Sequence, residues 1–278
     1  MNITYEEIKK RKSVRTFEDR LLLPEIKETF VSFIQSNQKG PFGNEIRFEL
    51  IDLTGAGQEE LKQLASYGNI RGPKYFMAGV VKKNTTAVLD YGYLMEKNIL
   101  AAVTLGIGTV WVGGTFSRAG FMKKIEAKAD EIIPAVVPLG YAAKIRDVSD
   151  TATRLFVAAD TRKSWKDIFF NGNHETLLTE EESGNYKIPL AALRLAPSAS
   201  NKQPWRIIKD GEVLHLFLER TPGYWQEPRE DIQLMDMGIG MCNFDMAAQE
   251  LGLNGKWEIK EGPKGKDGWI YIASRGKF

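Results

Sequence analysis

The chain has 278 residues, enough for roughly two domains of ordinary size, and its 43% apolar and 27% charged residues are typical of a folded globular protein. Its 38 Lys and Arg residues nearly balance 36 Asp and Glu residues, so the net charge of +2 predicts neither a nucleic acid nor an anionic membrane as partner. One cysteine excludes an internal disulfide, and two histidines distant in sequence argue against a metal site. The longest apolar run, residues 99–114, is too short to span a bilayer, and the start of the chain lacks an apolar leader. These features predict a cytoplasmic protein.

Hydrophobic periodicity and turn residues predict alternating helices and strands in the first part of the chain. The predicted helices are 5–11, 24–36, 58–66, 90–105 and 118–130. The predicted strands are 46–53, 75–81, 109–112 and 135–141. The helix at 90–105 is apolar nearly all round, which indicates a buried central helix.

After a polar connector at 147–153, residues 162–170 resemble the start of a helix and 171–185 a polar linker. The second part then repeats the order of the first in shortened form. Its predicted elements are helices 188–196 and 231–251 and strands 205–210, 213–219, 256–260 and 268–274.

The two long helices match one another residue by residue. Seven residues recur at the constant offset that separates Asp90 from Asp236, in the same helix–glycine–strand context. The matched pairs are Asp90 and Asp236, Gly92 and Gly238, Ala101 and Ala247, Ala102 and Ala248, Leu105 and Leu251, Gly106 and Gly252, and Trp111 and Trp257. This register predicts an internal duplication in which two halves pack as a symmetric dimer fused into one chain.

We therefore expect an α+β fold with a first half at 1–170, a linker at 171–185 and an abbreviated second half at 186–278. Each half would hold a short mixed or antiparallel sheet flanked by helices. The halves would pack through their long helices.

A cationic cluster closes the first predicted helix. Arg11 and Arg15 are four residues apart, with Lys12 and Ser13 between them, so their side chains can converge on one phosphate group. The alternatives are a solvated basic turn or, with the preceding lysines 9–10, a nucleic-acid patch.

A second candidate cluster lies at 197–201, in the sequence PSASN between a helix and a strand. Its hydroxyl and amide groups could bind a flat polar heterocycle, although such residues also form ordinary turns. The glycines at 106 and 108 do not make a dinucleotide fingerprint, because Trp111 stands where the third glycine is needed. Cys242 is expected in the core, and Trp225 is a candidate pocket residue.

The chain contains RKSVRTF at 11–17 and, later, APSASNKQPWRI at 196–207. Together and in this order, the two motifs resemble those of the nitroreductase family of FMN-dependent oxidoreductases. The segments at 102–114, 137–141 and 162–168 fit the same pattern, so the resemblance covers nearly the whole chain. RxSxR occurs only in the first half and PSxxN only in the second. The chain therefore resembles the two-repeat, Thermotoga-type branch, in which one polypeptide mimics the usual dimer.

The resemblance implies which residues bind FMN. Those facing the phosphate would be Arg11, Lys12, Ser13, Arg15, Arg162 and Lys163. Those at the ring would be Gly113 and Gly114 near N5, Pro197, Ser198, Ala199, Ser200 and Asn201 along the edge, and Asn69 and Arg71 at the pyrimidine. No protein group would be obligatory for catalysis, because the chemistry takes place on flavin N5.

The implied activity is hydride transfer from NADH or NADPH and reduction of a small-molecule acceptor, such as a nitroaromatic or a quinone, in a ping-pong cycle. The alternative is a non-catalytic flavin-binding or regulatory protein with the same fold. One chain would form a monomeric pseudo-dimer that binds one FMN, and further dimerisation stays open.

Overall fold

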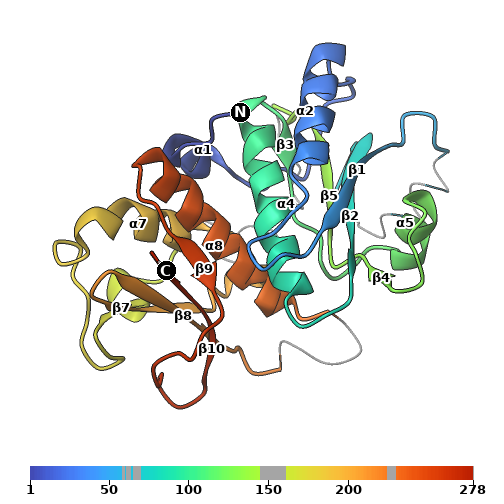
Figure 1. Cartoon of the computed structure of the whole chain (residues 1–278). Helices are drawn as coiled ribbons and strands as arrows, with labels where there is room; N and C mark the ends of the chain where they lie inside the picture. Colours follow the sequence, from blue (N-terminus) through green and yellow to red (C-terminus); the bar gives the residue numbers. More distant parts are fainter. Residues whose placement is uncertain (58–59, 61–63, 65–69, 145–160, 224–229, 278) are drawn as a thin grey trace.

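Two long helices from different parts of the chain lie side by side at the centre of the molecule, with one β-sheet on either side of the pair (Figure 1). They are α4 (Ala87–Thr104) and α8 (Ile232–Glu250). The structure is a computed structural model, and it describes residues 1–57, 60, 64, 70–144, 161–223 and 230–277. The predicted helix at 58–66 and connector at 147–153 lie largely or wholly outside the described residues.

The first sheet is antiparallel throughout and is buried on both faces. Its strands are β1 (Ile46–Asp52), β2 (Tyr75–Lys82), β5 (Val136–Gly140), β3 (Gly108–Thr109) and, paired with β2, β4 (Glu131–Ile132). Along β2, Tyr75 and Met77 enter the main core, whereas Phe76 and Ala78 enter a second apolar cluster on the opposite face. Successive strand residues point to opposite faces, so this continuous apolar run is a strand with a core on each side.

The second sheet is mixed. Its order is β6 (Phe169–Asn171), β7 (Trp205–Asp210), β8 (Val213–Glu219), β10 (Trp269–Gly276) and β9 (Lys256–Glu258). Only the β6–β7 pair is parallel. The predicted mixed or antiparallel sheets are therefore confirmed.

The expected helix start at 162–170 is wrong. A single turn, η1 (Trp165–Asp167), is followed by β6, which pairs with β7 of the expected second half. Phe169 lies in the main core, and Phe170 lies in a separate cluster with Phe217. Two adjacent aromatic side chains can be buried on opposite faces by a strand, whereas one helix face cannot hold both.

The remaining helices cover the sheets: α1 (Tyr5–Lys10), α2 (Pro24–Ser36), α5 (Arg118–Lys124) and α7 (Lys187–Leu195). The short turns η2 (Gly184–Tyr186) and η3 (Ala199–Asn201) lie on either side of α7. α5 ends before the predicted residue 130, because Glu126 has a left-handed φ of 49° and Arg47 donates 2.9 Å to the carbonyl of Ile125.

Two glycines allow the backbones of α4 and α8 to touch. A Cβ on Gly92 would lie 2.2 Å from the carbonyl oxygen of Met235, and one on Gly238 would lie 2.0 Å from that of Leu89. The contact is reciprocal, since each matched glycine faces the backbone of the other helix. The internal duplication stays a prediction, and this reciprocity is the feature of the fold that it would explain.

A buried polar network adds a second link across the helix pair. Asp245 of α8 accepts hydrogen bonds from Tyr93 Oη of α4 at 3.0 Å and from Arg275 Nε of β10 at 2.8 Å. Arg275 is 2% exposed, so removing either partner would leave a charge buried without compensation.

Gly238→Ala is predicted to lower the free energy of unfolding by about 3 kcal/mol or more, because the added methyl group would collide with a backbone carbonyl that cannot move without separating the helices. The control is Gly240→Ala in the same helix, where the new Cβ would meet its nearest atom at 3.4 Å. Alanine's higher helix propensity should make that variant neutral or more stable by up to about 1 kcal/mol. Urea unfolding measures both, and equal effects would contradict the proposed close contact.

Candidate functional site

A pocket of about 260 Å³ lies at the start of α8, where the N-terminal segment meets the second part of the chain. Arg11, Ser13 and Arg15 line it from the N-terminal segment, Val110, Trp111 and Gly113 from the segment after β3, and Arg162 and residues 197–201 from the second part. α8 contributes one face through Ile232, Met235, Asp236 and Ile239, which follow helical spacing.

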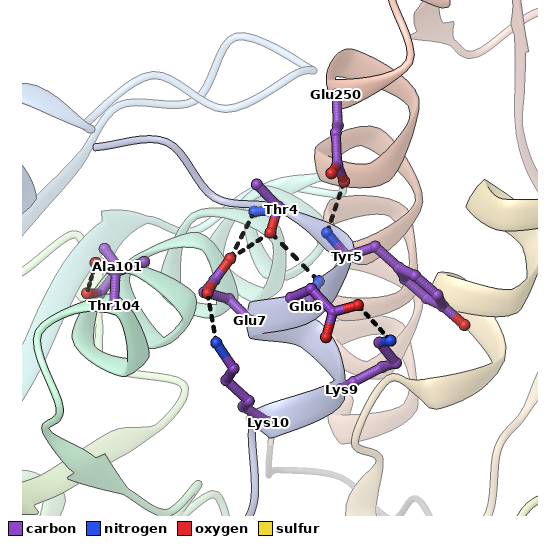
Figure 2. Close-up of polar contacts among 9 residues, drawn as sticks. All are labelled: Thr4, Tyr5, Glu6, Glu7, Lys9, Lys10, Ala101, Thr104 and Glu250. Carbon is purple, nitrogen blue, oxygen red and sulfur yellow. Dashed lines mark hydrogen bonds and ion pairs between the residues drawn. The ribbon is translucent and has the colours of Figure 1, made fainter.

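The first turn of α1 is fixed by two sets of hydrogen bonds (Figure 2). Arg11 follows the last turn of this short helix. Thr4 and Glu7 form a reciprocal capping box at the start of the helix. The backbone N–H of Tyr5 donates 2.7 Å to Glu250 at the end of α8. The first turn is thereby tied to the helix that lines the pocket.

Arg11 lies beside a fully buried carboxyl group. Its Nε is 3.8 Å from Glu96 Oε1, and its side chain is only 7% exposed. The indole N–H of Trp111 donates 2.8 Å to Glu96 Oε2. Burial raises the pKa of Glu96, while the charge of Arg11 and the indole hydrogen bond oppose the rise. Glu96 thus orients two side chains of the pocket wall.

Arg15 belongs to an extended segment held by backbone hydrogen bonds on both sides. Val14 N–H donates 2.8 Å to Thr109 O, and Arg71 N–H donates 2.8 Å to Arg15 O. The guanidinium of Arg15 is therefore carried into the pocket by a fixed backbone.

The 197–201 loop has an unusual backbone. Ser200, Asn201 and the following Gln203 have left-handed φ values of 44°, 55° and 49°, which non-glycine residues seldom adopt. Hydrogen bonds hold this shape, including Gln203 N–H to Ser198 Oγ at 2.8 Å and Lys163 N–H to the Gln203 side chain at 2.8 Å. Such strain tends to persist where the backbone serves a ligand.

Arg162 is part of the same loop structure. Its guanidinium donates 3.1 Å to the carbonyl of Leu195 and 3.5 Å to the side chain of Asn201. It therefore adds a third positive charge to the pocket and braces the loop.

The carboxyl group of Asp236 has one free oxygen atom. The residue is 1% exposed, and its Oδ1 accepts a 3.0 Å hydrogen bond from Ala199 N–H. Its Oδ2 is buried and has no hydrogen-bond partner among the residues that the structure describes. Burial raises the pKa of Asp236 well above its usual value, and the nearby Asp231 raises it further.

The structure brings together most of the predicted residues that it describes. Arg11, Ser13, Arg15, Gly113, Arg162 and residues 197–201 line the same pocket. Four others that are described do not line it: Lys12, Arg71, Gly114 and Lys163. Asn69 and Trp225 lie outside the described residues.

Those four have other surroundings. Lys12 lines a smaller neighbouring cavity, and Gly114 is exposed. Arg71 is exposed and pairs through its backbone with Arg15 and Phe17. Lys163 is surrounded by other charged groups, including Arg206 and Glu219. Burial and the charge of Arg206 lower the pKa of Lys163.

The sequence motifs did not predict the α8 face of the pocket, nor Val110 and Trp111. Asp236 had a signal, since it is a matched residue of the repeat and stands in the first turns of a long helix. Ile232, Met235 and Ile239 had none beyond ordinary helical periodicity, which core residues share.

The described residues contain no group of three or more His, Cys, Asp or Glu side chains placed to hold a metal ion. Nor does any helix in those parts of the chain combine the length and apolar character that crossing a membrane requires.

The sequence model of a nitroreductase family, described as "Putative TM nitroreductase", matches residues 3–248. The chain belongs to this family. A solved structure from Thermotoga maritima, bearing the same kind of description, has a TM-score of 0.60 at 19% identity and covers 99% of this chain and 92% of its own. The predicted α+β nitroreductase-like fold and the family resemblance are therefore confirmed.

Two further solved structures each cover about half of this nitroreductase-family chain. A nitroreductase family protein from Clostridium difficile 630 is 19% identical, has a TM-score of 0.42 and covers 56% of this chain and 92% of its own. A protein titled FMN-dependent nitroreductase from Clostridium difficile R20291 is 16% identical, with a TM-score of 0.40 and coverage of 52% and 92%. No curated protein matches the chain.

Glu96→Ala is predicted to lower the free energy of unfolding by about 3 kcal/mol, because it leaves the Trp111 indole N–H without its buried acceptor and the Arg11 guanidinium without its ion-pair partner. Glu96→Gln, which keeps an acceptor for the indole, should lose less. The control is Glu28→Ala on the exposed face of α2, expected within about 0.5 kcal/mol of the parent. Denaturant unfolding that showed the same small change for Glu96→Ala and Glu28→Ala would contradict this role.

Proposed function

We propose that this nitroreductase-family chain is an FMN-dependent oxidoreductase that accepts a hydride from NADH or NADPH and reduces a small-molecule acceptor such as a nitroaromatic or a quinone. One observation carries the proposal. Arg15 and Ser198, which belong to the two motifs that the family resemblance assigns to opposite ends of the flavin, line the same pocket although they are far apart in sequence.

The cationic part of the pocket fits the phosphate of FMN. Arg11, Arg15 and Arg162 line it together with the hydroxyl group of Ser13. A phosphate monoester carries nearly two negative charges and three acceptor oxygens, which planar guanidinium groups bind in a bidentate manner. Three cations would offset its removal from water.

The polar and apolar remainder fits a flat ring system. The 197–201 loop offers hydroxyl, amide and backbone groups along one side, and Ile232, Met235 and Ile239 give an apolar surface. Gly113 lets its backbone lie close to the side chain of Ile232, because a Cβ at this position would be 2.7 Å from Ile232 Cδ1. FMN would supply the hydride chemistry at N5, and the protein would bind, orient and exclude water.

We further propose that one chain binds one FMN as a monomeric pseudo-dimer in the cytoplasm. In the first half, the loop at 40–44 (GPFGN) occupies the place that PSASN takes in the second half, and it packs onto α4. Asp90, the counterpart of Asp236, accepts hydrogen bonds at 2.9 Å from both Phe42 N–H and Asn44 N–H. A Cβ on Gly40 would lie 2.3 Å from Asp90 Cγ, so this contact leaves no space between loop and helix.

The double variant Arg11→Ala/Arg15→Ala is predicted to bind FMN at least about 100-fold more weakly, because two charge-assisted hydrogen-bond donors to the phosphate are lost. The matched control is Arg20→Ala/Lys82→Ala, which removes two exposed positive charges outside the pocket lining. Quenching of flavin fluorescence gives both dissociation constants. Full FMN occupancy in the pocket variant would refute the assignment of the phosphate site.

Anaerobic addition of NADH or NADPH to the FMN-loaded protein is expected to bleach the oxidised flavin absorbance, and subsequent addition of a quinone should restore it. The separation of the two half-reactions tests the ping-pong cycle. Bound FMN that neither donor bleaches would instead favour the alternative, a flavin-binding or regulatory protein.

A further inference from the structure

The two halves treat a matched aspartate differently. In the first half, Asp90 Oδ1 accepts from Phe42 N–H, and its Oδ2 accepts from the backbone and side chain of Asn44 at 2.9 and 2.7 Å. In the second half, the described residues give Asp236 a single hydrogen bond, from Ala199 N–H to Oδ1. The same part of the chain offers no partner to its buried Oδ2, although Asp236 lines the candidate flavin pocket.

An unpartnered buried carboxyl oxygen normally needs an explanation, because desolvation without a hydrogen bond is unfavourable. A bound ligand that supplies the missing partner would provide one. The loop that bonds Oδ1, residues 197–201, is the segment that the family resemblance places beside the flavin ring, so Asp236 lines the part of the pocket expected to meet the ring.

The protonation state of Asp236 follows from its surroundings. The residue is 1% exposed and has one N–H donor to stabilise a negative charge, whereas Asp90 has three. Asp231, at the start of the same helix, opposes ionisation, although Arg220 partly neutralises it through a two-point ion pair. Among the described residues, none of the pocket guanidinium groups of Arg11, Arg15 and Arg162 donates a hydrogen bond to Asp236 Oδ2.

We propose that Asp236 is a flavin-contacting residue whose carboxyl group is protonated and donates a hydrogen bond from Oδ2 to an acceptor atom of the ring. The inference rests on the proposed FMN site. A neutral acid suits this position because the ring presents carbonyl oxygens and nitrogens as acceptors, and an ionised carboxylate would repel the negative charge that reduction adds to the ring. The contact would therefore strengthen when the flavin is reduced.

Two substitutions separate a donor from an acceptor. Asp236→Asn keeps an oxygen for Ala199 N–H and places an amide N–H₂ donor at the free position, so FMN affinity should stay within about threefold of the parent. Asp236→Leu removes the donor and should weaken FMN binding by about tenfold or more. The midpoint potential of the bound flavin should fall in the leucine variant and change less in the asparagine variant.

Asp90→Asn is the matched control, because it makes the same exchange at the corresponding position of α4, whose carboxyl group lines neither cavity described above. Its FMN affinity should equal that of the parent. Thermal unfolding of each variant shows whether it is folded. If Asp236→Leu does not fold, the asparagine variant and the infrared measurement below still decide the question.

Infrared difference spectroscopy of the flavin-free protein reads the protonation state directly. At neutral pH the parent minus Asp236→Asn spectrum should contain the C=O stretching band of a neutral carboxylic acid, whereas Asp236 as a carboxylate would overturn the proposal. Weakening of FMN binding in Asp236→Asn to the level of Asp236→Leu, or normal binding in Asp236→Leu, would also overturn it. A parent protein that binds no FMN would refute the proposed function instead, and the infrared result would stand independently.

Discussion

The close packing of α4 against α8 is the constraint on which the rest of the molecule depends. Gly92 and Gly238 bring the two backbones into contact, and the Tyr93–Asp245–Arg275 network ties the same helices to the second sheet. Any side chain larger than glycine at the crossing would push the two sheets apart. The pocket at the start of α8 would widen with them, because α8 supplies one of its walls.

That packing allows one binding site to draw on distant parts of the chain. α1 is anchored to the end of α8 by Glu250, and it delivers Arg11 beside Glu96 of α4. The opposite wall comes from a strained loop that Arg162 braces. Arg11 and Arg162 are therefore held by contacts with α4 and with the 197–201 loop. Such contacts keep positively charged side chains close together before an anion binds.

The two expected halves surround their matched aspartates, Asp90 and Asp236, differently. Around Asp90 the loop closes on the helix and satisfies both carboxyl oxygens, which stabilises the fold. Around Asp236 the loop contains residues with left-handed backbone, donates one hydrogen bond to the carboxyl group, and leaves its second oxygen without a partner among the described residues. If the halves arose by duplication, the first copy has a closed, stabilising loop at Asp90 in place of a binding site. The second copy has kept a pocket in which the hydrogen bonding of Asp236 is incomplete.

Local patterns in the sequence predicted most of the helices and strands, because periodicity, capping and turn chemistry depend on neighbouring residues. For example, α2, β7 and β8 have their predicted bounds. The cationic and PSASN motifs could likewise be recognised from short segments. The family, the mixed architecture and the pairing of the long helices followed from motif order and the repeat. Only the tertiary structure decided that β6 joins the second sheet, that Arg71 and Lys163 do not line the pocket, and that Asp236 does. Strand partners and side-chain burial are set by long-range packing, and no short window of sequence contains it.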